Sequence, residues 1–111
     1  MSRTAVRASE AICAAARHMW PSKTAINLAS RAGVTRRAAE LWLSGDNEIS
    51  GEAQANLLRS DAGFPFMQAI MGGADTRWWR DFERSARLRE IEQRIEWQTE
   101  QLANLKAEIS R

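Results

Sequence analysis

The sequence has little of what most enzyme chemistry requires. It contains a single cysteine, Cys13, and a single histidine, His18, among its 111 residues. One cysteine cannot form an intramolecular disulfide, and a zinc site usually needs three or four ligands drawn mainly from cysteine and histidine. A nucleophile–base pair could draw only on His18, and no glycine-rich phosphate loop follows a strand. These shortages predict a protein that is not an enzyme and that holds no metal or other cofactor.

Long apolar stretches are also missing. No run of roughly 18 or more apolar residues occurs, so we expect no membrane-spanning segment. The alanine-rich run at 11–16 lies between Glu10 and Arg17 and is too short for the apolar region of a signal peptide. The lone cysteine suits a reducing compartment. Together these features favour a soluble, cytoplasmic protein.

Helical spacing dominates the segments that are present. Strand-like alternation of apolar and polar residues is absent, whereas apolar residues recur at helical intervals. On the second predicted helix, Ile26, Leu28 and Ala29 are expected to face inward. The predicted helices cover residues 4–19, 23–32, 35–43, 50–63 and 64–71, followed by one long helix to the C-terminus.

Polar caps and glycines mark the boundaries of these helices. Ser22, Thr35 and Ser50 can each cap a helix start through a side-chain oxygen. Gly33 and Gly45 are predicted to end the second and third helices. Asp75 or Thr76 is predicted to cap the start of the long helix. Gly72 and Gly73 divide a predicted domain over 1–73 from a predicted oligomerisation helix over 74–111. The sequence therefore predicts an all-α fold of five helices followed by one long helix.

Positive charge is concentrated near the N-terminus. The whole chain has a formal net charge of +2, and only two of its 16 basic residues are lysine. Residues 1–47 hold seven basic and three acidic residues, a net charge of +4, whereas 48–74 carry −2 and 75–111 are neutral. A polyanion would therefore bind the N-terminal part, and arginine suits bidentate recognition of phosphates and bases.

Residues 25–45, AINLASRAGVTRRAAELWLSG, carry the most specific pattern. Two helices that cross steeply leave room only for a small residue at Ala29, and Gly33 can adopt the positive φ that the turn between them needs. Val34 would fill the gap beneath the turn, and Thr35 would accept a backbone N–H of the second helix. The buried positions on that second helix would be Ala39 and Trp42.

This pattern resembles the Xre/phage-repressor type of helix-turn-helix, over roughly residues 5–71. That family commonly reads L-A-x-x-x-G-V-S/T-x-x-x-apolar-x-x-W-x-x-G, followed by a loop and a fourth helix that begins with serine. The matching residues here are Leu28, Ala29, Gly33, Val34, Thr35, Ala39, Trp42 and Gly45, with Ser50 at the usual distance. The resemblance implies a five-helix DNA-binding domain whose second motif helix lies in the major groove.

The same resemblance implies which residues meet DNA. Arg36 and Arg37 suit guanine, whose N7 and O6 accept both prongs of a guanidinium. Glu40 could accept from cytosine or orient either arginine at helical spacing, and Leu41 could pack on a thymine methyl or mark a protein-binding face. The implied base-reading set is Thr35, Arg36, Arg37, Glu40 and Leu41, and the implied phosphate-contact set is Lys23, Thr24, Asn27, Arg31 and Ser44.

The long C-terminal helix carries a heptad pattern from Leu88 onward. Its a and d positions are Leu88, Ile91, Ile95, Gln98, Leu102, Leu105 and Ile109. A free helix with this stripe would expose an apolar seam, so we expect an intermolecular coiled coil, the alternative being a fold back onto the N-terminal domain. Gln98 could fix register, and Arg87 facing a partner's Glu92 favours a parallel pair, with a dimer favoured over a tetramer. Upstream, Trp78 and Phe82 are expected to pack on the first and fifth predicted helices and so fix the long helix to the N-terminal domain, whereas Trp79 is expected to face elsewhere.

These features predict a sequence-specific transcriptional regulator that binds inverted repeats in double-stranded DNA as a dimer or higher oligomer. Two alternatives stay open. Small terminase subunits also join an N-terminal helix-turn-helix to an oligomerising helix, so one alternative is a DNA-packaging or recombination accessory factor that forms rings. The other is a protein-interaction module that does not bind DNA and that contacts an unknown protein partner through Leu41, Trp79 and Trp97.

Overall fold

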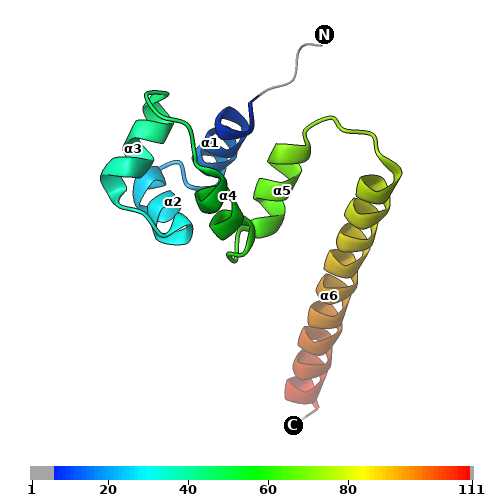
Figure 1. Cartoon of the computed structure of the whole chain (residues 1–111). Helices are drawn as coiled ribbons and strands as arrows, with labels where there is room; N and C mark the ends of the chain where they lie inside the picture. Colours follow the sequence, from blue (N-terminus) through cyan, green and yellow to red (C-terminus); the bar gives the residue numbers. More distant parts are fainter. Residues whose placement is uncertain (1–6, 111) are drawn as a thin grey trace. The chain divides into compact units, whose positions relative to one another are not determined.

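The computed structural model describes residues 7–110 of the chain, and over that range it is helical without strands (Figure 1). The helices are α1 (Ala8–Met19), α2 (Thr24–Ala32), α3 (Arg36–Ser44), α4 (Gly51–Leu58), α5 (Gly63–Met71) and α6 (Arg77–Ile109). The predicted all-α fold of five shorter helices followed by a long one is confirmed. The predicted start of the first helix at residue 4 lies outside the described residues. The chain divides into two compact units, Met1–Gly73 and Ala74–Arg111, here called the N-terminal and C-terminal units.

Local capping explains several of the helix boundaries. The hydroxyl of Thr35 accepts the backbone N–H of Ala38 at 3.1 Å, and the hydroxyl of Ser50 accepts that of Ala53 at 3.1 Å. Both predicted caps are confirmed. Gly33 ends α2 with a φ of +73°, which a residue with a Cβ adopts only at a cost. Together these residues fix the three-residue turn between α2 and α3.

Of the other two predicted caps, Ser22 is wrong, whereas Thr76 is the N-cap residue of the long helix but makes no side-chain capping bond. Ser22 does not cap α2, because the N-cap is Lys23, which has a φ of +58° and makes no side-chain capping hydrogen bond. The left-handed backbone at Lys23 turns the chain directly before the helix, so α2 begins one residue later than predicted. The long helix begins after Thr76, whose side chain makes no capping bond, and Asp75 instead pairs with Arg80 at 3.3 Å.

The N-terminal unit closes around one apolar core. Its largest fully buried side chains are Ile12, Leu28, Leu57 and Phe66, one each from α1, α2, α4 and α5. Helix α2 packs most extensively against α3, α1 packs against α5, and α4 contacts both α2 and α5 (Figure 1). The two helices of the predicted motif are therefore held on a frame formed by the other three.

Core positions within the motif follow the sequence pattern except at one residue. Ala29, Ala39 and Trp42 are buried as predicted, and Val34 packs against the same core. The prediction that Ile26 faces inward is wrong, since its side chain is 48% exposed. Successive helical residues point about 100° apart, so the inward arc that contains Leu28 and Ala29 leaves Ile26 outside it.

The C-terminal unit consists mainly of α6. Its 33 residues correspond to about 50 Å at a rise of ~1.5 Å per residue. The expected orientation of its first aromatic residues is wrong, because Trp79 is buried whereas Trp78 and Phe82 are more than half exposed. Trp79 stacks on Phe82, three residues further along, with ring centroids 5.8 Å apart. Among residues 7–110, no helix combines the length and apolar character needed to cross a membrane.

Candidate nucleic-acid interface

The start of α3 presents two exposed guanidinium groups. Thr35 caps the helix, and Arg36 and Arg37 occupy its first two positions, with no acidic residue in the first turn. The side chains of Arg36 and Arg37 are 66% and 76% exposed. The positive end of the helix dipole lies at the same place. An anion that approaches this turn therefore meets two fixed cations and a favourable dipole.

Glu40 is one turn further along α3 and pairs with both arginines. Its carboxylate oxygens lie 3.4 Å from Arg36 Nε and 3.8 Å from Arg37 Nη1. The predicted role of Glu40 in orienting the arginines at helical spacing is consistent with these distances. Exposed ion pairs of this kind contribute only about 0–1 kcal/mol. Either guanidinium can therefore leave the carboxylate for a phosphate or a base edge at little cost.

The remaining base-reading candidates, Thr35 and Leu41, differ in how much of their side chain is exposed to a ligand. Thr35 is exposed, and although its hydroxyl accepts from Ala38, the O–H can still donate. Leu41 is half-buried, so only part of its apolar surface can meet a ligand. The polar part of the α3 surface is therefore more accessible than its apolar part.

The start of α2 offers a third cation. Lys23 is exposed, and because its side chain makes no capping bond, the first N–H groups of α2 have no N-cap side chain as acceptor. The Thr24 hydroxyl donates to the Trp20 carbonyl, and the Asn27 amide donates to the Lys23 carbonyl at 2.9 Å. The side chains of Thr24 and Asn27, both predicted to contact phosphates, are therefore already used in hydrogen bonds that stabilise the turn. The charge of Lys23, in contrast, faces solvent.

Arg31 has strong intramolecular partners. Its guanidinium donates to both carboxylate oxygens of Asp61, at 2.7 and 3.2 Å, and lies 4.5 Å from the centroid of the Trp20 ring. The hydrogen bond from Arg31 holds the pKa of Asp61 below its usual range. Arg31 thus ties α2 to the turn between α4 and α5. Sequence reasoning could not find this pair, because the two residues are 30 positions apart.

Ser44, at the end of α3, is also engaged within the chain. Its hydroxyl lies 2.7 Å from a carboxylate oxygen of Asp46 and 3.1 Å from the Leu41 carbonyl. A carboxylate so close to a proposed phosphate contact would repel the phosphate. Of the predicted phosphate-contact set, Arg31 and Ser44 are therefore placed less favourably than Lys23.

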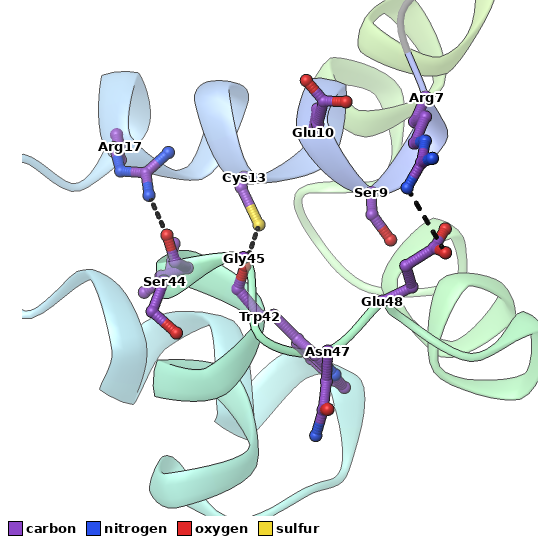
Figure 2. Close-up of a pocket in the computed structure, with 11 residues that line it drawn as sticks. Arg7, Ser9, Glu10, Cys13, Arg17, Trp42, Ser44, Gly45, Asn47 and Glu48 are labelled. Carbon is purple, nitrogen blue, oxygen red and sulfur yellow. Dashed lines mark hydrogen bonds and ion pairs between the residues drawn. The ribbon is translucent and has the colours of Figure 1, made fainter.

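A cavity of about 420 Å³ lies between α1 and the end of α3 with its following loop (Figure 2). Arg17 donates to the Leu43 carbonyl at one end, and Arg7 pairs with Glu48 at 3.6 Å at the other. The lining residues are Arg7, Ser9, Glu10, Cys13, Arg17, Trp42, Leu43, Ser44, Gly45, Asn47 and Glu48. No sequence motif joins these residues, which come from segments far apart in the chain.

Cys13 at this cavity is not set up as a nucleophile. Burial raises the pKa of its thiol, and the nearby Arg17 offsets only part of this rise. The thiol therefore stays protonated near neutral pH, with its sulfur 3.5 Å from the Trp42 carbonyl that accepts from it. Within residues 7–110, no cluster of histidine, cysteine, aspartate or glutamate side chains is arranged to hold a metal ion.

The α2–turn–α3 segment thus offers an anion three exposed cations at two helix starts. Lys23 stands before α2 and Arg36 and Arg37 begin α3, and among the described residues only Glu40 is paired with any of them. Guanidinium groups in this setting can donate to phosphate oxygens or to base edges. Comparisons of the chain with family models, curated proteins and solved structures find no match.

Proposed function

We propose that the chain is a sequence-specific DNA-binding transcriptional regulator whose α2–turn–α3 segment binds double-stranded DNA. The observation that carries this proposal is the pair of exposed arginines at the capped start of α3, balanced by the single carboxylate of Glu40. A helix start that displays two exposed guanidinium groups suits a major groove, where guanine N7 and O6 accept bidentate donors. The resemblance of residues 25–45 to an Xre-type helix-turn-helix points to the same role.

The proposed contacts divide into two kinds. Arg36 and Arg37 read base edges, and Glu40 holds them in place when DNA is absent. Lys23 contacts a phosphate together with the N-terminal N–H groups of α2. We leave Arg31 out of the DNA-contact set because its guanidinium is committed to Asp61 and Trp20. Asp46 beside Ser44 argues against a phosphate at that position.

Self-association through α6 completes the proposal. The apolar residues of the heptad pattern are 44% to 83% exposed on α6, which is more apolar surface than a single helix keeps in water without a partner. Two copies joined through α6 would present two α3 helices to an inverted repeat. The same architecture would serve a DNA-packaging factor if the oligomer were a ring, so the number of subunits separates the two functions.

The test is to select DNA fragments that the full chain retains, and then to measure the affinity of variants for the selected site. Arg36→Ala and Arg37→Ala should each weaken binding by about 1–3 kcal/mol and relax the preference at one base pair. Arg59→Ala, which removes an exposed arginine from the end of α4, serves as the control for net charge. Retention of no fragment at low salt, or unchanged binding by both α3 variants, would refute the proposed interface.

A further inference from the structure

The apolar residues of α6 form one unbroken heptad seam. The helix is continuous from Arg77 to Ile109, so the spacing of three and four residues is not interrupted by a kink or a turn. The seam comprises Leu88, Ile91, Ile95, Gln98, Leu102, Leu105 and Ile109, and every one of these side chains is exposed. A seam that must be covered over ~30 Å of helix needs a partner helix of matching length.

The residues that flank the seam restrict the number of partners. The e and g positions that lie beside it are Glu92, Arg94, Thr99, Gln101, Lys106 and Glu108, all polar or charged and all exposed. Apolar residues therefore occupy only the a and d positions, which is the narrow stripe typical of a two-stranded coiled coil. A four-helix assembly would bury more of these flanking charges, so the pattern favours one partner.

We infer that α6 pairs with α6 of a second copy of this chain, in parallel and in register, and that Gln98 sets this orientation. The inference rests on the self-association that the proposed function requires and adds its geometry. Helix α6 of a second copy carries a seam of matching length and heptad phase. A second copy is therefore a partner that can cover the seam. One further feature of α6, the polar residue Gln98, selects the parallel arrangement and the register.

Gln98 is the polar residue within the seam, at a d position. In a parallel in-register pair, d faces d, so each Gln98 meets its own copy, and a carboxamide carries both donors and an acceptor. The two side chains can then hydrogen-bond to each other. In an antiparallel pair with the seam aligned, a faces d, so Gln98 would face Ile95, and the amide of the other copy would lie in the neighbouring layer, about 4.5 Å further along the helix axis. A shift by one heptad within the parallel pair would also separate the two amides.

Charge at the seam edge is compatible with this choice but does not decide it. In the parallel pair, Arg87 at g faces Glu92 at e of the partner helix, which is attractive. In an antiparallel pair with the seam aligned, Arg87 would instead face Glu108, which is also attractive. The orientation therefore depends on Gln98, because only the parallel in-register pair places the two amides opposite each other in one layer.

Charged residues at the upstream a and d positions set the N-terminal limit of the coiled coil. Continuing the heptad upstream places Asp81 at an a position and Arg84 at a d position. In a parallel in-register pair each of these charges would face its own copy, and such like-charge contacts are unfavourable. The coiled coil therefore begins at Leu88 and does not include the part of α6 before that residue.

Disulfide trapping of the full chain tests the orientation directly. In a Cys13→Ala background, Leu105→Cys places one thiol on each helix. In the parallel pair the two thiols meet and a covalent homodimer forms in a glutathione redox buffer, whereas in an antiparallel pair they would lie roughly 25 Å apart. An equimolar mixture of Leu88→Cys and Leu105→Cys chains should give homodimers but no excess of the mixed dimer. Light scattering under reducing conditions verifies that each variant still self-associates.

The role of Gln98 has its own variant. Gln98→Leu removes the amide that discriminates between orientations, so the same assay should now yield the mixed Leu88→Cys/Leu105→Cys dimer alongside the homodimers. Gln93→Leu, at an f position away from the seam, is the matched control and should leave the product pattern unchanged.

The outcomes separate this inference from the proposed function. A mixed dimer as the main product without the Gln98 substitution would overturn the parallel orientation while leaving dimeric DNA binding intact. Homodimers alone in the Gln98→Leu background would overturn the role of Gln98. A monomer in light scattering would overturn both the inference and the dimeric part of the proposed function. Homodimers from Leu105→Cys that give way to mixed products only with Gln98→Leu would support the inference.

Discussion

Lys23 combines an unfavourable backbone conformation with an exposed charge. Its φ of +58° makes it the one residue other than glycine with a positive φ in the described part of the chain. For a residue with a Cβ this conformation costs roughly 1–2 kcal/mol, and such costs are concentrated at functional sites. A glycine or an asparagine would occupy the position more easily. We therefore propose that the ammonium group of Lys23 serves a phosphate contact, because the residue does not serve the stability of the fold.

Replacing Lys23 should therefore move stability and DNA binding in opposite directions. Lys23→Gly relieves the left-handed conformation, so the free energy of unfolding measured in denaturant should rise by about 1 kcal/mol. The same variant should bind DNA more weakly, and its slope of log affinity against log salt concentration should fall by about 1 because one phosphate contact is lost. Lys23→Asn keeps a residue that tolerates this φ and should show the same change in slope. An unchanged slope in both variants would remove Lys23 from the interface.

Asp61 gives the second prediction at this scale, through its hydrogen bond with Arg31. The pKa of Asp61 is lower in the folded chain than in the unfolded chain, so the pair stabilises the fold above the unfolded pKa. This contribution is lost as pH falls through the folded value, below about pH 4. Asp61→Asn should lower Tm at neutral pH and flatten the fall of Tm at pH values below about 4. Arg31→Lys keeps the charge but loses the two-pronged contact, so its Tm at neutral pH should lie between those of the parent chain and of Asp61→Asn. An Asp61→Asn chain with the same Tm profile as the parent would contradict the assignment.

At the scale of elements, the sequence predicts what is local and misses what is not. The caps at Thr35 and Ser50 and the helix end at Gly33 depend on residues within one turn, and all three are found as predicted. The pair of Arg31 and Asp61 joins segments 30 residues apart, which no local pattern encodes. The arginines at the start of α3 were predicted as neighbours of Glu40 because helical spacing brings them together. The candidate interface could thus be located from sequence, but Arg31's partner could not.

Helix α6 shows how one position limits a pairing element. Arg84 occupies the d position of the heptad before Leu88, where its replacement by leucine would extend the apolar seam. Burying that leucine contributes about 1.5 kcal/mol or more per helix, so Arg84→Leu should raise the Tm of the self-associated chain and lower its dissociation constant. Circular dichroism melts at several protein concentrations would measure both. Arg89→Leu, at a b position, adds the same apolar surface away from the seam and should change neither. Equal effects of the two variants would contradict the assigned heptad phase.

Over the whole molecule, the two units differ in how they bury apolar surface. The N-terminal unit encloses its own core, with Ile12, Leu28, Leu57 and Phe66 fully buried. Apart from Trp79, every described residue of the C-terminal unit is at least partly exposed, including all the large apolar residues from Leu88 onward. Charge is divided in the same way, since the positive excess lies in residues 1–47 and residues 75–111 are neutral. We propose that the N-terminal unit binds DNA and that the C-terminal unit determines how many chains associate.

This division predicts that the two roles can be separated by one substitution. Ile95 lies near the centre of the seam, so Ile95→Asp places a carboxylate where a partner helix would bury it. Burying an unpaired charge costs desolvation free energy, which an exposed substitution does not. The full-length variant should be monomeric by light scattering. The cooperative thermal unfolding of the N-terminal unit should be retained, because its core contains no residue of the seam. Gln93→Asp, at an exposed position opposite the seam, adds the same charge and should remain associated.

The DNA-binding behaviour of the monomeric variant distinguishes the remaining functions. If two copies hold one inverted repeat, Ile95→Asp should lose roughly 10²–10⁴-fold in affinity for the full site, because the second contact is no longer intramolecular. Its affinity for a single half-site should match that of the parent chain. Equal affinity of variant and parent for the full site would show that α6 does not contribute to DNA binding. A parent that forms a ring of eight or more subunits would instead favour the DNA-packaging function, because a ring holds many copies around one duplex and a regulator of inverted repeats needs two.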